Sequence, residues 1–212
     1  MRLRTLPRSF FDRDPRRVAR GLLGKLLVRR SGRRLRAGRI VEVEVYLAEK
    51  DPAAHAFRGP TPRNRVLFGP PGHAYVYLIY GAHFCLNVSC LPPGNAGCVL
   101  LRALEPVAGL EEMARARKVG LDGKRALERL TSGPWRLCQA LGVTRARDNG
   151  KDFTRSDLTI AEDGFRPRRI AVTPRIGIRQ AARRPLRYLI AGNTFVSPPR
   201  PQRTPRRKKK GP

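Results

Sequence analysis

The clearest alternation of hydrophobic and polar residues runs from Arg39 to Leu47. Valines occupy every second position from 41 to 45, and Glu42, Glu44 and Tyr46 lie on the other side of the alternation. Because successive side chains of a β-strand point to opposite faces, this period predicts a strand with the valines on one face and the two carboxylates on the other.

Two further strand patterns lie close together and predict a hairpin. The segments 75–80 and 84–89 are rich in aromatic and hydrophobic residues, and Gly81-Ala82-His83 joins them as a short turn. Tyr80 is therefore expected near the hairpin tip. Other strands are predicted at 26–28, 98–104, 170–178 and 186–190, and the segment 29–36 is predicted to be a basic hairpin turn.

Helices are expected at several places between these strands. Asp14 followed by Pro15 is typical of a helix start, and this helix should run towards Gly24. The remaining helices are predicted at 110–118, 127–130 and 135–141. Residues 48–72 are rich in Pro, Gly and Arg, and a loop of that length in a compact domain is usually functional or disordered. The mixture predicts an α+β fold class.

Composition adds an expectation about the partner. The chain has 45 Lys plus Arg against 16 Asp plus Glu, a net charge of +29 and a pI near 11.6. Basic side chains displace counterions from a phosphate backbone, so a nucleic acid is the expected partner. Residues 198–212 hold seven basic residues and no acidic one. Their composition predicts a disordered tail that tethers DNA, after one domain over residues 1–197.

Other features argue against membranes, export and metal. No apolar run approaches the ~20 residues of a membrane-spanning helix, and the N-terminus lacks the apolar region of a signal peptide. The four cysteines show no CxxC spacing, so buried reduced thiols are expected, with a zinc site or a disulfide framework as the alternative. These features predict a cytoplasmic or nucleoid protein.

Glu44 is the strongest catalytic candidate in this carboxylate-poor chain. It lies between valines and close to Tyr46, and aromatic residues recur at Tyr75 and Tyr77. Aromatic faces stack on an electron-poor or cationic base, and a carboxylate beside them can take a proton from water. The alternative is that Glu44 pairs with an arginine and that the tyrosines belong to the core.

Short motifs occur in a fixed order along nearly the whole chain. They are RIVEVEVYL (39–47), DPAAH (51–55), TPRNR (61–65), PGHAYVYLIYG (71–81), CLNV (85–88), VLLRALEP (99–106), SGP (132–134), RIGI (175–178) and RPLRY (184–188). This ordered set resembles the alkyladenine (3-methylpurine) DNA glycosylase family, in a bacterial form. The resemblance implies a base-excision repair enzyme with a curved, mainly antiparallel sheet, flanking helices and a projecting hairpin that intercalates into DNA.

The resemblance also implies how a damaged base would be held and cleaved. Glu44 would be the general base that activates water, Arg102 would help to hold that water, and the backbone carbonyl of Ile176 would make a third contact. Tyr46 and His55 would stack on one face of the flipped base, with the His55 backbone N–H bonded to its edge. The other face would be covered by Tyr77.

Further residues would contact DNA or select the substrate. Asn87 matches the gatekeeper whose amide crowds the 2-amino group of normal guanine. Tyr80 matches the side chain that fills the gap left by the flipped nucleotide, and Ala82 beside it is smaller than the residue often found there. Phosphate contacts are expected from Arg58, Arg63 and Arg65.

The implied reaction is hydrolysis of the N-glycosidic bond of alkylated or deaminated purines in duplex DNA, which leaves an abasic site. No metal or organic cofactor is implied, and a monomer is expected. A lyase step needs an amine nucleophile, and no lysine lies in the pocket motifs. Two alternatives stay open: an inactive protein that binds damaged DNA, against which Glu44 and Arg102 argue, and an RNA-binding protein, which would need neither Asn87 nor Tyr80.

Overall fold

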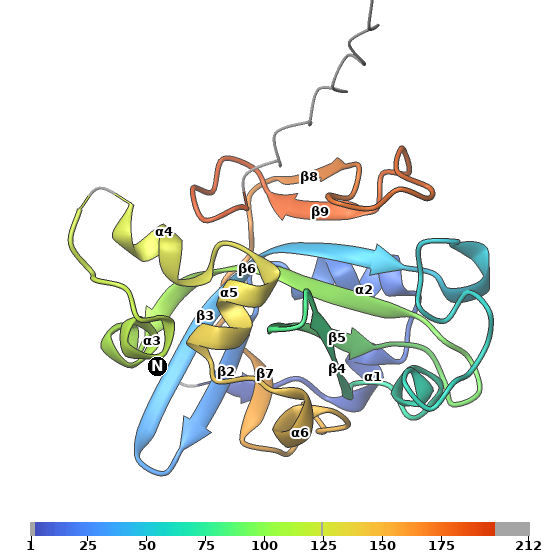
Figure 1. The fold of residues 1–212 in the computed structure, drawn as a ribbon, viewed down its shortest axis with the longest axis horizontal. Coiled ribbons are helices and arrows are strands. Elements are labelled where there is room, and N and C mark those ends of the chain that lie inside the picture. The colour runs from blue at the N-terminus through green and yellow to red at the C-terminus, as the bar shows by residue number, and fades with distance from the viewer. Residues whose placement is uncertain (1–2, 124, 198–212) are drawn as a thin grey trace, which may run out of the picture.

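A curved antiparallel sheet organises the described residues, 3–123 and 125–197, in the computed structural model (Figure 1). The predicted α+β fold class and mainly antiparallel sheet are confirmed. Along the sheet the order is β1 (Arg4–Thr5), β7 (Leu158–Glu162), β2 (Leu26–Ser31), β3 (Arg34–Tyr46), β6 (Cys98–Ala108), β5 (His83–Ser89) and β4 (Ala74–Ile79), while β9 (Arg187–Ile190) pairs with β3 and with β8 (Ile170–Thr173). The predicted tail, residues 198–212, lies outside the described residues and stays a prediction.

Strand β3 is the centre of this arrangement. Its first half pairs with β2 along one edge, its residues 42–44 pair with β9, and β6 runs along the other edge. Val41, Val43 and Val45 are all fully buried in the main core, as the alternation predicts. Since each fully buried valine contributes roughly 1.5–3 kcal/mol, a one-residue slip of β3 would be strongly disfavoured.

Helices cover the sheet and close its ends. Helix α2 begins at Pro15 as predicted, and the Asp14 carboxylate accepts a 2.8 Å hydrogen bond from the Arg16 backbone N–H. Helix α5 packs against β5 and β6 and also contacts α3 and α4 (Figure 1). The helical bounds are α1 (Arg8–Phe11), α2 (Pro15–Leu22), α3 (Leu110–Arg117), α4 (Ala126–Thr131), α5 (Pro134–Ala140) and α6 (Arg145–Asp148), with 3-10 turns η1 (Ala48–Lys50) and η2 (Arg65–Phe68).

The pairing of β3 with β6 shifts register at three places, and two of these are β-bulges that flank Glu42. The partner of Ile40 is Leu104 and the partner of Glu42 is Ala103, which leaves Val41 as an extra residue on β3. Val43 then pairs with Leu101, so Arg102 is an extra residue on β6. A bulge bends its strand and re-aims the side chain that it carries. The second bulge therefore sets the direction of Arg102 beside the carboxylates of β3.

The hairpin of β4 and β5 carries Tyr80 at its tip, as predicted. Tyr80 is 71% exposed, and its backbone lies in the left-handed region with φ of 51°. Gly81 follows with φ of 70°, and the Ala82 N–H bonds to the Ile79 carbonyl at 3.3 Å. A left-handed conformation costs a non-glycine residue about 1–3 kcal/mol, so this turn stores strain at its exposed tyrosine.

Several element boundaries differ from the sequence-based predictions. The basic hairpin turn predicted over 29–36 is present but shorter, because β2 continues to Ser31 and pairs with β3 from Arg34. The strand predicted over 170–178 ends at Thr173, because Pro174 lacks the N–H needed to continue a ladder. Strand β7 and helix α6 were not predicted. Residues 174–178, which follow the end of β8, turn towards β3 and contribute Ile176 to the site described below.

The four cysteines are free and buried, which confirms the predicted thiols. No helix in the described part of the chain is long and apolar enough to cross a membrane.

Candidate active site

Glu44 lies in the interior with three hydrogen-bond donors around its carboxylate. Its side chain is fully buried. The Ile176 backbone N–H donates to Oε1 at 2.8 Å, the Tyr46 hydroxyl donates to Oε2 at 3.0 Å, and Nη1 of Arg102 lies 3.2 Å from Oε1. Burial raises the pKa of Glu44, while Arg102 and the two hydrogen bonds act in the opposite direction. The group is therefore a carboxylate with raised proton affinity, as a general base requires.

The Ile176 contact differs in kind from the predicted one. From the sequence, the backbone carbonyl of Ile176 is predicted to contact the water molecule. In the structure, the backbone N–H of Ile176 donates a hydrogen bond directly to Glu44. The carbonyl's role as a water contact stays a prediction. The N–H bond is possible because segment 174–178 leaves the sheet after β8 and passes beside β3.

A buried ion pair fixes that segment and one wall of the site. Arg175 forms two hydrogen bonds with the Asp51 carboxylate, at 2.5 and 2.8 Å, and a third to the Val45 carbonyl at 2.9 Å. Its guanidinium carbon lies 4.6 Å from the centre of the Tyr46 ring. This pair joins the start of the 48–72 segment to the segment carrying Ile176. Neither Asp51 nor Arg175 was singled out from the sequence.

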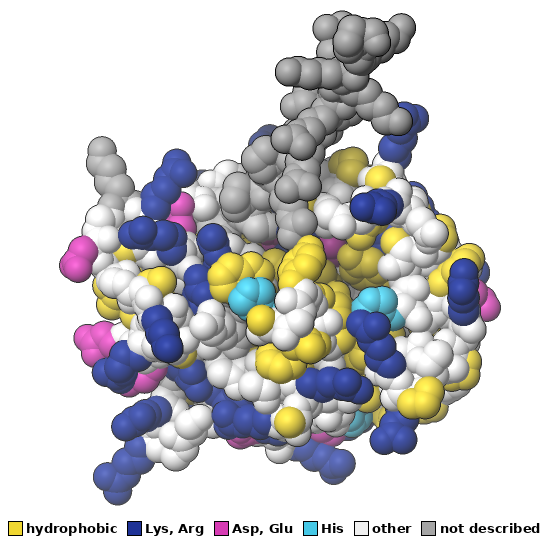
Figure 2. Space-filling view, in the orientation of Figure 1, with side chains coloured by type: hydrophobic (Ala, Val, Ile, Leu, Met, Phe, Trp, Pro, Cys, Tyr) yellow, Lys and Arg dark blue, Asp and Glu magenta, His cyan; other side chains and the backbone are white. Residues whose placement is uncertain are grey.

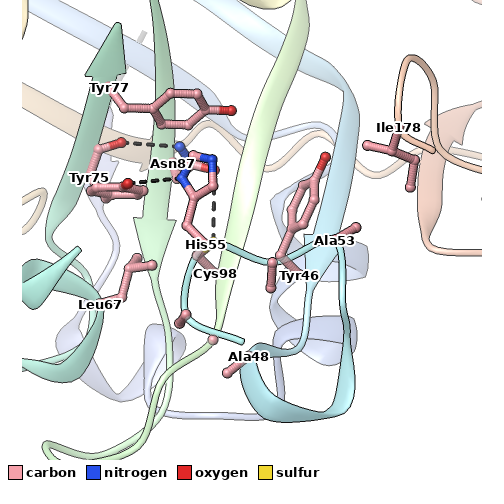
Figure 3. A pocket seen from close by; sticks show the side chains of 13 residues that line it. Tyr46, Ala48, Ala53, His55, Leu67, Tyr75, Tyr77, Asn87, Cys98 and Ile178 are labelled. Atoms are coloured by element: carbon pink, nitrogen blue, oxygen red, sulfur yellow. Dashed lines mark hydrogen bonds between the residues drawn. The ribbon is translucent and has the colours of Figure 1, made fainter. Parts of the chain in front are cut away.

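An inner cavity of about 130 Å³ opens between β3, β4, β5 and the 48–72 segment (Figure 3). Its walls include Tyr46, His55, Tyr75, Tyr77 and Asn87. The predicted base-binding residues therefore come together in space, although they are spread over three strands and a loop. The aromatic rings give the cavity faces suited to a flat, electron-poor ring.

The His55 ring is held by two tyrosines. Its Nδ1 lies 2.9 Å from the Tyr75 hydroxyl, and its ring centre is 4.5 Å from that of Tyr77, at an angle of 72°. Desolvation within the cavity, followed by repulsion from Arg63, lowers the pKa of His55 and so favours the neutral ring, although the residue as a whole is exposed at the cavity. In this structure the rings of His55 and Tyr77 touch edge to face. Tyr46 lies on the Ile178 side of the cavity (Figure 3). A base stacked between His55 and Tyr77 would require these rings to separate.

Asn87 lies at the back of the same cavity in a fixed orientation. It is 2% exposed, its Nδ2 donates to the Tyr75 carbonyl at 3.1 Å, and the Cys98 thiol lies 3.8 Å from its Oδ1. Both ends of the amide therefore have partners in the protein wall (Figure 3). An amide held this way cannot rotate freely to accommodate a bulkier purine.

An outer cavity of about 410 Å³ leads from the inner one towards the hairpin tip. The two cavities share Tyr46, His55, Tyr77 and Ile178, and the outer one also reaches Tyr80. The residues bonded to Glu44, namely Tyr46, Arg102 and Ile176, all line the outer cavity. The carboxylate therefore lies directly behind the wall of a passage that begins at the exposed hairpin.

Basic side chains surround this passage. Figure 2 shows hydrophobic side chains gathered at the centre of this face, with Lys and Arg side chains spread around them. Arg63 is exposed and its guanidinium lies 5.7 Å from the centre of the Tyr77 ring, so it stands at the cavity rim. Arg58 and Arg65 are exposed on the same segment, and none of these three arginines lines either cavity directly. Their role as phosphate contacts stays a prediction.

A second buried carboxylate, Glu42, was also not singled out as functional. It is fully buried and bonded to Arg102, Arg187 and Ser197. The scarcity of carboxylates that pointed to Glu44 applied equally to Glu42 and Asp51. Within residues 3–123 and 125–197, no group of three or more His, Cys, Asp or Glu side chains is arranged as metal ligands.

Comparisons with known proteins identify the family of the chain. A family model described as methylpurine-DNA glycosylase (MPG) matches residues 9–194. A relative from Koribacter versatilis, named as a 3-methyladenine DNA glycosylase, is 59% identical over 92% of this chain and 94% of its own length. Relatives of the same name from Burkholderia lata and Methanoculleus marisnigri are each 48% identical, over 92% and 91% of this chain and 91% and 98% of their own lengths.

Proposed function

The chain belongs to the methylpurine-DNA glycosylase family, and from that premise we propose that it excises alkylated and deaminated purines from duplex DNA. The observation that carries the proposal is the buried Glu44 carboxylate, with Tyr46, Arg102 and Ile176 around it, behind an aromatic cavity. The substrates proposed are 3-methyladenine, 7-methylguanine, hypoxanthine and ethenoadenine.

The proposed reaction is hydrolysis by a water molecule next to Glu44. The carboxylate takes a proton from this water while the oxygen attacks C1′ of the sugar, and the C1′–N bond breaks with its electron pair leaving on the purine. Alkylation at N3 or N7 makes the purine cationic and therefore a good leaving group. The product is an abasic site, and we propose no lyase step because no lysine among residues 3–123 and 125–197 lines either cavity.

The cavity chemistry supports a cationic or electron-poor base. Tyrosine faces attract such rings, by about 1–3 kcal/mol per stacked base. A neutral His55 adds a further ring without repelling a positive charge. We propose that the base stacks against Tyr46, His55 and Tyr77 once His55 and Tyr77 separate, with the His55 backbone N–H on its edge.

The DNA side of the proposal rests on the exposed hairpin and the arginines. Tyr80 would enter the minor groove and occupy the space of the flipped nucleotide, since a wedge offsets part of the unstacking cost. Arg58, Arg63 and Arg65 would contact phosphates next to the lesion. We further propose that the protein acts as a monomer on chromosomal DNA in the cytoplasm.

Single-turnover excision on four duplexes tests the proposed function. Each duplex carries one 3-methyladenine, 7-methylguanine, hypoxanthine or ethenoadenine, and strand cleavage at abasic sites is the readout. We expect release of at least the cationic methylpurines and no strand cleavage before alkaline treatment. Tight lesion binding with no excision of any base would favour an inactive DNA-binding protein, and preference for RNA of equal length would favour an RNA-binding one.

Asn87→Ser is expected to relax discrimination against bases that carry a 2-amino group. The smaller side chain removes the amide that stands at the back of the cavity, so 7-methylguanine release should rise roughly 10-fold relative to 3-methyladenine. Slow release of normal guanine should become measurable. Asn95→Ser, at an exposed amide outside both cavities, is the matched control. An unchanged substrate ratio would remove Asn87 from the gatekeeper role.

A further inference from the structure

Next to Glu44 lies a buried cluster of charged side chains, Glu42, Arg102 and Arg187. The proposed reaction gives no role to Glu42 or Arg187. Glu42 lies two residues before Glu44 on β3 and is likewise fully buried. Its Oε1 accepts hydrogen bonds from Nε of Arg102 at 2.9 Å and from Nε of Arg187 at 2.6 Å. The Ser197 hydroxyl donates to the same oxygen at 2.8 Å, and the Ser197 N–H donates to Oε2 at 2.6 Å.

These hydrogen bonds keep Glu42 ionised and fix its position. Burial by itself would raise the pKa of Glu42, but Arg102, Arg187 and Ser197 lower it below the ordinary value. Four donors already bind its two oxygens, so Glu42 is a fixed anion and is poorly suited to take a proton from water. Glu44 has the opposite character, because its pKa is raised and, within the described part of the chain, its one ion pair is with Arg102.

The geometry around Arg102 shows what the fixed anion does. Each of the three guanidinium nitrogens of Arg102 meets a different oxygen. Nε donates to Glu42, Nη2 donates to the Ser197 hydroxyl at 3.2 Å, and Nη1 lies 3.2 Å from Glu44. Because a guanidinium is planar and rigid, fixing two of its nitrogens also fixes the direction of the third.

We propose that Glu42 and Ser197 are positioning residues that hold the guanidinium of Arg102 with Nη1 facing Glu44. This inference rests on the proposed function. Arg187 from β9 is the second cation bonded to Glu42. Glu42 therefore has a cation of its own, although Arg102 is shared with Glu44. Ser197 brings the C-terminal end of the described chain into the wall of the outer cavity, which makes that segment part of the site.

A double-mutant cycle tests whether Glu42 acts through Arg102. Glu42→Gln is measured by single-turnover excision at saturating enzyme, in the wild-type background and in the Arg102→Ala background. If Glu42 positions Arg102, its replacement should slow excision roughly 10-fold in the first background and less than about 2-fold in the second, a coupling typical of residues in one hydrogen-bond network. Lesion affinity should stay nearly unchanged, because Glu42 itself lines neither cavity.

Matched variants separate positioning from general loss of structure. Glu162→Gln removes the charge of an ion-paired carboxylate on β7, remote from the cavities, and Ser156→Ala removes a hydroxyl bonded to the Leu158 carbonyl. Neither should change the excision rate. Ser197→Ala keeps every charge and should slow excision about 3-fold, again only when Arg102 is present. If Glu42→Gln does not fold, the comparison of Ser197→Ala in the wild-type and Arg102→Ala backgrounds decides whether the network positions Arg102.

The results that overturn the inference differ from those that overturn the function. Equal slowing by Glu42→Gln in both backgrounds, or no slowing in either, would overturn the positioning role while leaving wild-type excision intact. A wild-type protein that releases no lesion would overturn the proposed function, and this inference with it.

Discussion

Replacement of Glu44 by glutamine is expected to slow single-turnover excision by roughly 10²- to 10⁴-fold, the usual contribution of a general base. Glutamine is isosteric: its one carbonyl oxygen can accept the hydrogen bond from the Ile176 N–H, and its amide NH2 can donate to the Tyr46 hydroxyl oxygen, so the cavity should keep its shape. Lesion affinity should therefore change little. Excision on the 3-methyladenine and hypoxanthine duplexes, with Glu162→Gln as the control carboxylate, measures the effect. Near-normal excision by Glu44→Gln would remove Glu44 from the base role.

The pH dependence of the wild-type rate gives a second check on Glu44. A general base must be ionised, so the rate should fall as the pH drops through the pKa of Glu44. Because burial raises that pKa above the ordinary 4.5, the acidic limb should lie above pH 4.5. The limb should be absent in Glu44→Gln. A wild-type rate that stays level down to pH 4.5 on a cationic lesion would contradict the assignment.

Tyr80→Ser is the second large effect expected. Unstacking a nucleotide costs a few kcal/mol, and removing the wedge should forfeit about 2 kcal/mol of the compensation. That corresponds to roughly a 30-fold loss in the flipped population. Serine retains a Cβ and the same left-handed backbone, so the turn itself should persist. Fluorescence of a base analogue opposite or beside the lesion, together with the excision rate, measures flipping.

A control for Tyr80→Ser is available at another exposed aromatic residue. Phe165 is 42% exposed and follows β7, which lies near the opposite end of the strand order from β4. Phe165→Ser removes similar apolar surface without touching the hairpin. Equal loss of flipping in both variants, or an unchanged affinity in Tyr80→Ser, would argue against the wedge.

The parts of the fold that follow a local period could be predicted from the sequence. The valines of β3 are fully buried because a two-residue period fixes which face meets the core. Tyr80 lies at a tip because Gly81 permits the tight turn after a run of strand-forming residues. In both cases the information is contained in fewer than about ten neighbouring residues.

The parts that depend on distant contacts could not be predicted. Arg175 binds Asp51 across 124 residues of sequence, and no local pattern encodes such a pairing. The same holds for Ser197 and Glu42, which are separated by 155 residues. Strand β7 has an alternating pattern, but its five residues are too few to distinguish a strand from a loop. The catalytic candidate emerged from the rarity of acids, and that signal could not separate Glu44 from Glu42.

The paired bulges between β3 and β6 constrain which single-residue deletions these two strands can tolerate. Val41 is an extra residue on one strand and Arg102 on the other, so the register is the same before and after the pair of bulges. Deleting either residue alone would shift one flank of the ladder by a position and turn its buried side chains outward. A viable single-codon deletion at one strand should therefore require a compensating deletion at the other. The codon for Arg102 thus carries a spacing function in addition to encoding a guanidinium.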